Sequence, residues 1–278
     1  MTALIHSKVS ARIPMVPGKH ERAFTLTELL VVMATLAILA VLLLPALAKS
    51  GDNGARMVCL NNLRQLGTAL NLYTGENRDY MPWPNWGNDP WPECPAGWLY
   101  RGSCDSLPLT YGSFGVQNWA QNQVVHVSQG AFWPYLHNAN IFICPNDLIP
   151  STNTLWAKRP NTLSTYTMNG ASCFFPIPNG QYSYATCKES QIWSPLCILM
   201  WEPDQTIDPG CYNDGSDYPG DGGMGHPPEG LGPLHITGGD VLTVSGSAQC
   251  MTPLEYTNEE SELGKNRLWW NPNTADGR

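Results

Sequence analysis

The chain has 278 residues, 14% of them charged, and a formal net charge of −8. Glycine and proline are abundant, but eleven tryptophans and eleven tyrosines supply large apolar side chains for a core, so the composition excludes low-complexity disorder. The acidic balance argues against nucleic acid as a partner, because phosphate contacts need lysine and arginine.

The first 23 residues are basic and poorly hydrophobic. Lys8, Arg12, Lys19 and Arg22 stand there against the single acid Glu21. Basic residues before an apolar segment favour a cytoplasmic N-terminus and a translocated C-terminal part. We therefore expect most of the chain to face away from the cytoplasm.

An uncharged run of twenty residues, 29–48, follows the acid Glu28. A helix of about this length spans a bilayer core, and a carboxylate at its edge is costly. Thr25-x-x-Glu28 matches a capping box, which gives the acid a local role. An alternative for the whole run is a cleaved secretory signal, because residues 46–48 read Ala-Leu-Ala.

The segment 22–32, RAFTLTELLVV, resembles the processing motif of type IV prepilins and type II secretion pseudopilins. The resemblance implies that 1–23 is a leader, removed by prepilin peptidase between Ala23 and Phe24. The new amine of Phe24 would then be methylated, and 24–48 would remain as a transmembrane and assembly helix. Ala23 departs from the glycine that usually precedes the cut.

The resemblance also implies a role for Glu28, which becomes the fifth residue of the mature chain. The amine of Phe24 in a neighbouring subunit would neutralise this carboxylate and fix the stagger between helices. Pro45 stands where helices of the family often carry proline, and it removes one backbone hydrogen bond. With residues 51–54, Gly-Asp-Asn-Gly, it predicts either a weak, bendable stem or a simple linker.

Residues 56–73 carry apolar side chains at spacings of three and four, which predicts an amphipathic helix lying on a sheet. We assign 49–80 to this continuation of the stem and 81–278 to an extracytoplasmic globular domain. Its expected strands are 139–144, 163–168, 196–201, 240–244 and 247–251. The expected fold is α+β: a long apolar helix packed on an antiparallel sheet, with large loop insertions rich in proline, glycine and tryptophan.

Five segments after the apolar run resemble a prepilin-like group, similar to the G protein of type II secretion and labelled by a processing-associated H-x9-DG element. They are 59–67, 142–147, 164–170, 198–202, and His235 with Ser245-Gly246. Ser245 stands where that group has aspartate. The element itself reads as a hairpin with Gly246 in its turn. His235 is either a hydrogen-bonded structural histidine or a ligand.

The chain has nine cysteines, and export makes disulfides chemically accessible. Cys94 and Cys104 are candidates to close a tryptophan-rich loop. Because Cys59 and Cys144 occur in two of the segments that carry the resemblance, their pairing is attractive. An odd number leaves at least one cysteine free or intermolecular, and connectivity does not follow from the sequence.

An acidic, glycine-rich loop contains Asp214, Asp217 and Asp221. Flexible oxygen-rich loops suit calcium, and some pseudopilins of the G type bind it near the C-terminus, but the spacing does not match an EF-hand. The alternatives are a weak calcium site and a solvated acidic loop; we expect no other metal or cofactor.

A second loop gathers aromatic residues that either form a local core or present a surface for sugars or partners. They are Trp83, Trp86, Trp91, Trp98 and Tyr100.

The sequence has no nucleophile-elbow, zinc-protease or P-loop motif, so we expect no enzymatic activity. The expected function is that of a pseudopilin-like structural subunit, whose partners are the prepilin peptidase and methyltransferase, other subunits and the cytoplasmic membrane. We expect a single membrane pass, with the globular part periplasmic or at the cell surface. The alternatives are an anchored carbohydrate-binding or adhesive protein and an anchored extracellular hydrolase.

Overall fold

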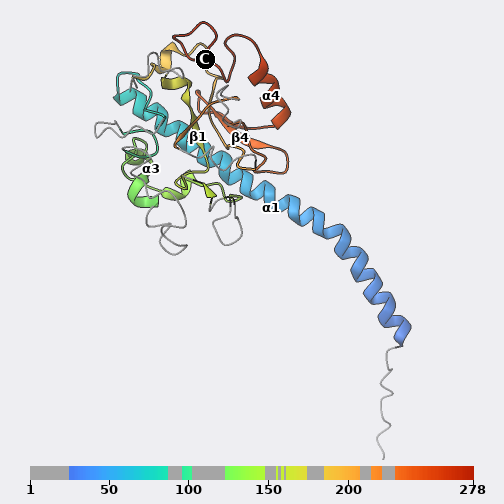
Figure 1. Ribbon diagram of the computed structural model, residues 1–278. Helices are drawn as coiled ribbons and strands as arrows, with labels where there is room; N and C mark the ends of the chain where they lie inside the picture. The colour runs from blue at the N-terminus through green and yellow to red at the C-terminus, as the bar shows by residue number, and fades with distance from the viewer. Residues whose placement is uncertain are drawn as a thin grey trace, which may run out of the picture. The chain divides into compact units, whose positions relative to one another are not determined.

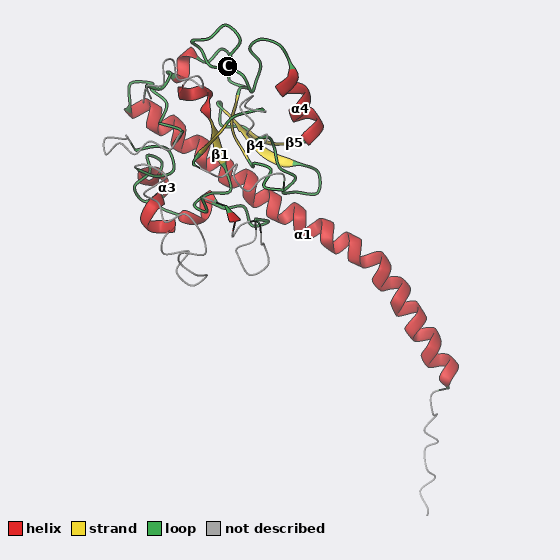
Figure 2. Cartoon of the chain, viewed as in Figure 1, coloured by secondary structure: helices red, strands yellow, loops and turns green. Residues whose placement is uncertain are grey.

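The computed structural model describes residues 25–86, 96–101, 123–147, 155, 158–159, 161–173, 185–206, 214–220 and 229–278. The chain divides into two compact units, Met1–Leu47 and Ala48–Arg278. The elements are α1 (Leu26–Glu76), α3 (Trp133–Leu136), η2 (Ala139–Phe142), β1 (Thr167–Asn169), η4 (Gly170–Cys173), η6 (Glu189–Gln191), β2 (Ile198–Trp201), β3 (Ser216–Asp217), β4 (Gly239–Thr243), β5 (Ala248–Met251) and α4 (Pro253–Ser261) (Figures 1 and 2).

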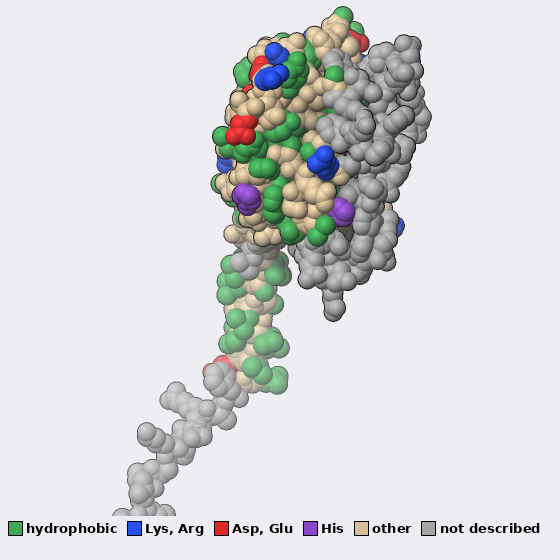
Figure 3. Space-filling view, turned by 90° about the vertical axis from the view of Figure 1, so that its left-hand side faces the viewer, with side chains coloured by type: hydrophobic (Ala, Val, Ile, Leu, Met, Phe, Trp, Pro, Cys, Tyr) green, Lys and Arg blue, Asp and Glu red, His purple; other side chains and the backbone are tan. Residues whose placement is uncertain are grey.

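The two halves of helix α1 differ in how far their apolar side chains are buried. From Leu26 to Leu44 every side chain is exposed, and the space-filling view shows hydrophobic side chains along this stretch (Figure 3). α1 is long and apolar enough to cross a membrane. In the second half, the expected apolar stripe is buried, with Leu63, Leu66 and Leu70 fully enclosed. The amphipathic pattern over 56–73 is thus confirmed.

The interruption considered around residues 51–54 is absent, because α1 runs unbroken from Leu26 to Glu76. A glycine costs about 1 kcal/mol in a helix relative to alanine, and the rest of a long helix offsets that penalty. The stem continuation ends at Glu76 rather than at residue 80. A turn follows, in which Arg78 and Asp79 adopt positive φ angles of 56° and 72°.

A five-stranded sheet forms the centre of the globular unit, in the order β3-β1-β2-β4-β5. The pairs β1·β2, β2·β4 and β4·β5 are antiparallel, but β1 and β3 are parallel. The sheet is therefore mixed, and the expectation of a purely antiparallel sheet is wrong at this edge. β1, β2 and β4 are buried along their whole length, as expected for strands covered on both faces.

The β4–β5 hairpin packs closely on α1. Gly246 in its turn has a φ of 81°, which favours glycine. A Cβ atom added to Gly67 of α1 would lie 2.9 Å from the Cα of Gly246 and 3.2 Å from the Leu242 side chain. Glycine at position 67 therefore allows the helix to approach the hairpin.

The predictions of two strands, 139–144 and 163–168, are wrong in whole or in part. Residues 139–142 form the 3-10 helix η2 instead, because the Asn138 side chain accepts a hydrogen bond from the backbone of Asn140 and closes a turn. Within 163–168, strand pairing begins only at Thr167. The Asn161 and Ser164 side chains accept hydrogen bonds from nearby backbone N–H groups there and replace the sheet ladder.

Candidate functional site

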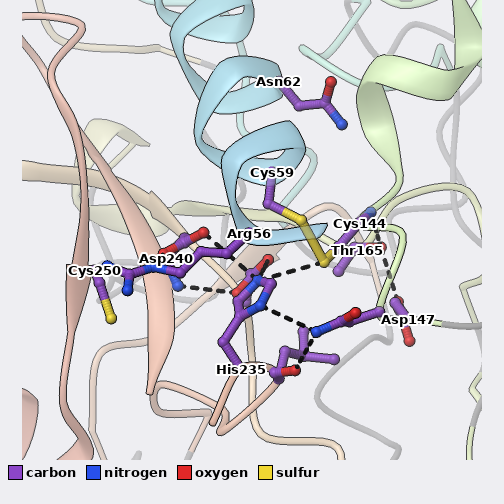
Figure 4. Close-up of polar contacts among 12 residues, drawn as sticks. Arg56, Cys59, Asn62, Cys144, Asp147, Thr165, His235, Asp240 and Cys250 are labelled. Atoms are coloured by element: carbon purple, nitrogen blue, oxygen red, sulfur yellow. Dashed lines mark hydrogen bonds and ion pairs between the residues drawn. A yellow bond between two sulfur atoms is a disulfide. The ribbon is translucent and has the colours of Figure 1, made fainter. Parts of the chain in front are cut away.

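His235 lies at the centre of a buried polar cluster in the globular unit (Figure 4). One face of α1 contributes Asp52, Arg56 and Cys59, whose spacings of four and three place them on neighbouring turns. The segment after η2 brings Cys144 and Asn146, and the end of β2 brings Glu202. The start of β4 adds Asp240.

The two ring nitrogens of His235 face different neighbours. Nδ1 lies 3.3 Å from Oδ1 of Asp52 and 3.1 Å from Nδ2 of Asn146. The Asn146 amide in turn donates to Oδ1 of Asp52 at 2.7 Å. On the opposite edge, Nε2 lies 3.6 Å from the Cys144 sulfur, while Asp240 Oδ2 and Glu202 Oε1 lie 3.5 and 3.7 Å away.

Cys59 and Cys144, the pair that the resemblance favoured, are joined by a disulfide with a Cα–Cα distance of 5.2 Å. The bond connects α1 to the segment after η2 across 85 residues of sequence. It also closes one side of the histidine site, because the Cys144 sulfur lies against the ring (Figure 4). Cys173, Cys187, Cys197 and Cys250 are free thiols, and Cys94 and Cys104 lie outside the described residues.

The cluster concentrates negative charge away from water. Burial raises the pKa of Glu202, and the nearby His235 imidazole opposes this shift. Burial and the neighbouring Glu202 raise the pKa of Asp240 to about 7, although His235 and Arg56 lower it. Burial disfavours a charged His235, but its carboxylate neighbours outweigh that cost and raise the pKa of the imidazolium.

A second buried network adjoins this site. Arg159 forms two hydrogen bonds of 2.7 Å to the Asp147 carboxylate, and its side chain also donates to Gln205. Thr165 donates to Asp147 at 2.8 Å, and its hydroxyl accepts a hydrogen bond from the backbone N–H of Cys144. The network therefore fixes the segment that carries one half of the disulfide.

The two ends of the expected H-x9-DG hairpin element lie apart. His235 is buried beside the start of β4, whereas Ser245 is exposed in the turn at the other end of that strand. A strand of five residues is about 16 Å long, so Ser245 and Gly246 do not contribute to the histidine site. Gly246 packs on α1 instead.

In the described part of the acidic loop, Asp214 and Asp217 are buried, so these two acids are not solvated. Asp214 accepts hydrogen bonds from Ser216, and Asp217 accepts one from Thr167. Neither residue belongs to a metal-compatible group among the described residues, and Asp221 lies outside them.

Of the aromatic loop, Trp83, Trp98 and Tyr100 are buried and Trp86 packs against the core. These residues therefore form part of a core rather than a surface for sugars, and Trp91 lies outside the described residues.

At the N-terminus, Ala23 and Phe24 lie outside the described residues, and Pro45 is part of α1. Glu28 makes the capping-box contacts: its carboxylate accepts from the backbone N–H of Thr25 at 2.9 Å and from the Thr25 hydroxyl at 2.8 Å. The backbone N–H of Glu28 donates to the same hydroxyl at 3.3 Å. Glu28 therefore caps the N-terminus of α1 within a single chain.

Five members of the histidine cluster were not singled out from the sequence: Asp52, Arg56, Asn146, Glu202 and Asp240. Asp52 was interpreted as part of a flexible stretch, although its spacing to Arg56 and Cys59 is helical. Glu202 directly follows the apolar run Ile-Leu-Met-Trp, and an acid beside a buried strand was the available signal. Asn146 lies in the segment 142–147 that carries the resemblance, which was the signal available for it, whereas Asp240 carries no local pattern that distinguishes it from a surface residue.

Chemically, the arrangement resembles a ligand set more than a catalytic cleft. The side chains of His235, Glu202 and Asp240 are 0% exposed, so a substrate does not reach them in this conformation. One ligand atom each from Cys59, Cys144, Glu202 and His235 lies within 4.8 Å of all the others, which suits a metal ion. In the oxidised chain described here, the two sulfurs are bonded to each other.

Comparison of the chain with protein-family models, curated proteins and solved structures finds no match.

Proposed function

We propose that the protein is a pilin-like filament subunit that is anchored in the cytoplasmic membrane through α1 before it assembles. The observation that carries this proposal is the division of α1 into a first half whose apolar side chains are all exposed and a second half with one buried apolar face. The exposed half requires apolar surroundings, which lipid provides first and the same helix of neighbouring subunits provides afterwards. The buried half connects that rod to the sheet.

In this proposal, prepilin peptidase cuts between Ala23 and Phe24, the methyltransferase modifies the Phe24 amine, and the N-terminus lies on the cytoplasmic side. The basic leader supports this orientation. The Cys59–Cys144 disulfide supports an extracytoplasmic globular unit, because disulfides persist in oxidising compartments.

Glu28 serves both the cap and assembly. Its carboxylate caps α1 through Thr25, but an ionised carboxylate has about four acceptor sites and has capacity for a further partner. The Phe24 amine of a neighbouring subunit is that partner. The pair lies among apolar helices, where an unpaired carboxylate is strongly unfavourable.

The two alternative functions receive less support. Trp83, Trp98 and Tyr100 are buried rather than arranged as a sugar-stacking surface. The neighbouring carboxylates Glu202 and Asp240 are fully buried, whereas a hydrolase needs its acid pair to line a cleft.

Two isosteric substitutions separate the cap from the charge pair. Glu28→Gln retains a carbonyl acceptor for the Thr25 cap but removes the charge, so we expect filament incorporation to fall at least tenfold. Thr25→Val removes the hydroxyl of the cap but keeps the charge, so incorporation should stay within about twofold. The measurement is the protein recovered in sheared filaments, relative to total membrane protein, in a host with the assembly machinery.

Membrane insertion of both variants serves as the control and should equal that of the natural chain. Normal incorporation of Glu28→Gln would contradict the charge pairing. Mass spectrometry of the native protein should find a methylated Phe24 at the mature N-terminus. A soluble product that begins at Lys49 would instead support the cleaved secretory signal.

A further inference from the structure

We propose that in its dithiol state the globular unit binds zinc through Cys59, Cys144, His235 and Glu202, and that disulfide formation closes this site. The inference does not depend on the filament function, because it concerns the buried cluster of the globular unit alone. It rests on the convergence of four ligand residues, on how the histidine is held and on buried carboxylate oxygens that lack hydrogen bonds.

The donor set fits zinc. Two thiolates, one imidazole nitrogen and one carboxylate oxygen make a four-coordinate site of ligands that this ion prefers. The four candidate atoms lie within 4.8 Å of one another, and all four residues are buried. Reduction frees the sulfurs to separate, and their backbones, 5.2 Å apart at Cα, lie on two different segments.

The histidine is oriented as a zinc ligand usually is. Ligating histidines typically donate the N–H of the other ring nitrogen to a carboxylate, which fixes the ring and its tautomer. His235 directs Nδ1 at two neighbours: Oδ1 of Asp52, 3.3 Å away, and the amide nitrogen of Asn146, 3.1 Å away, which also donates to that carboxylate. Nε2 is thereby directed at the sulfur of Cys144 and at Glu202, where the metal would bind.

The cluster also contains unsatisfied acceptors. Among the described residues, Glu202 Oε1 and Asp240 Oδ2 are buried atoms with no hydrogen-bond partner. Both face Nε2 of His235, at 3.7 and 3.5 Å, as the Cys144 sulfur does at 3.6 Å. One ring nitrogen carries at most one proton and cannot serve three acceptors. A divalent cation bound between the sulfurs and Glu202 would satisfy the sulfur and the Glu202 oxygen together.

The excess of negative charge around His235 also favours a bound cation. Glu202, Asp240 and Asp52 all face His235, and Arg56 is the cation paired with Asp240, at 3.3 Å. Buried carboxylates are costly unless cations or metals meet them. Zinc would neutralise two of the negative charges that thiolates and Glu202 bring to the site.

Formation of the Cys59–Cys144 disulfide is a two-electron oxidation of the two thiolates. A low-molecular-weight or protein disulfide outside the cytoplasm accepts two electrons from the two thiolates. The Cys59–Cys144 bond forms, the oxidant becomes two thiols after taking up two protons, and zinc is released.

The test uses the full-length chain in detergent, reduced with a phosphine under anaerobic conditions and incubated with zinc chloride. We expect one zinc per reduced chain and none on the oxidised chain. X-ray absorption at the zinc edge should find two sulfur and two nitrogen or oxygen ligands. No zinc on the folded reduced chain, or a shell of four sulfurs from other cysteines, would overturn the proposal.

Variants identify the ligands. His235→Ala and Glu202→Gln should each weaken zinc binding at least tenfold, while Asp52→Asn, which removes the charge of the carboxylate beside the ring, should weaken it roughly 10- to 100-fold. His137→Ala and Cys250→Ser are the matched controls and should bind as the natural chain does. Equal zinc affinity in His235→Ala and the natural chain would also overturn the proposal, and the absorption measurement decides the case if that variant does not fold.

Discussion

The stem, residues 26–44, and the globular unit depart from the usual distribution of side chains in opposite ways. The stem exposes many large apolar residues, whereas the globular unit encloses charged groups such as Asp147, Arg159 and Glu202. Soluble proteins ordinarily bury the former and expose the latter. Each departure therefore indicates a partner: apolar surroundings for the stem, and ion pairs for the globular unit.

The comparison also shows that sequence apolarity does not by itself determine burial. α1 carries leucines throughout, yet Leu39 is 53% exposed and Leu63 is 0% exposed. The difference comes from what the rest of the chain supplies. The sheet and its hairpin cover the second half of the helix, while the described residues leave the first half uncovered.

Removal of one partner from a buried ion pair should produce the largest loss of stability. Arg159→Met leaves Asp147 buried without its bidentate partner, and we expect the free energy of unfolding to fall by about 3–5 kcal/mol. Arg267→Met, which removes a partly exposed pair with Glu259, should cost less than about 1 kcal/mol. Urea unfolding of the full chain in detergent, followed by tryptophan fluorescence, measures both. Equal losses would remove the distinction between buried and exposed charge.

Truncation of matched leucines tests the two halves of α1 directly. Leu63→Ala should lower the free energy of unfolding of the globular unit by about 3 kcal/mol, because it opens a cavity in the core. Leu39→Ala should leave it within about 0.5 kcal/mol, because that side chain is exposed. The same unfolding assay applies. A large loss for Leu39→Ala would mean that the stem packs against the globular unit.

A pH dependence should arise from Glu229, whose pKa is raised to about 8 by burial and by the nearby Asp214, against the opposing hydrogen bond from the Tyr218 backbone. The folded chain then holds a proton more tightly than the unfolded chain. The protonated Glu229 carboxyl therefore contributes to the free energy of unfolding. This contribution is fully present below about pH 4.5 and is lost as the pH rises toward 8. The loss is less than about 1.4 kcal/mol per pH unit.

Glu229→Gln should therefore flatten the stability profile between pH 5 and 8, as measured by urea unfolding at several pH values. Glu255→Gln is the control, because Glu255 is exposed and its Thr252 cap lowers its pKa, so it titrates below this range. An unchanged slope in Glu229→Gln would show that this carboxyl is ionised in the folded chain.

Local sequence patterns predicted the parts of the fold that short-range physics controls. The stripe of α1, strand β2 and the β4–β5 hairpin follow from periodicity and turn chemistry. η2 was missed because a single asparagine cap outweighed an apolar strand-like pattern. The parallel pairing of β3 with β1 joins segments about 50 residues apart, and a two-residue strand gives no periodicity to detect.

The site was less predictable than the fold. His235, Cys59 and Cys144 were identified individually, but the sequence does not indicate that they meet, because they come from three separate segments. Asp52 was the hardest to recognise: its neighbours Gly51 and Gly54 favour a break, yet its role depends on an unbroken helix.

The position of the disulfide has a mechanical consequence. Cys59 lies near the start of the buried half of α1, and its bond to Cys144 joins the helix covalently to a distant segment of the fold. When tension is applied to the stem, the force passes at Cys59 into this cross-link. The turns of α1 beyond it are then shielded from extraction, so the globular unit resists being peeled open from its N-terminal end as long as the two sulfurs stay joined.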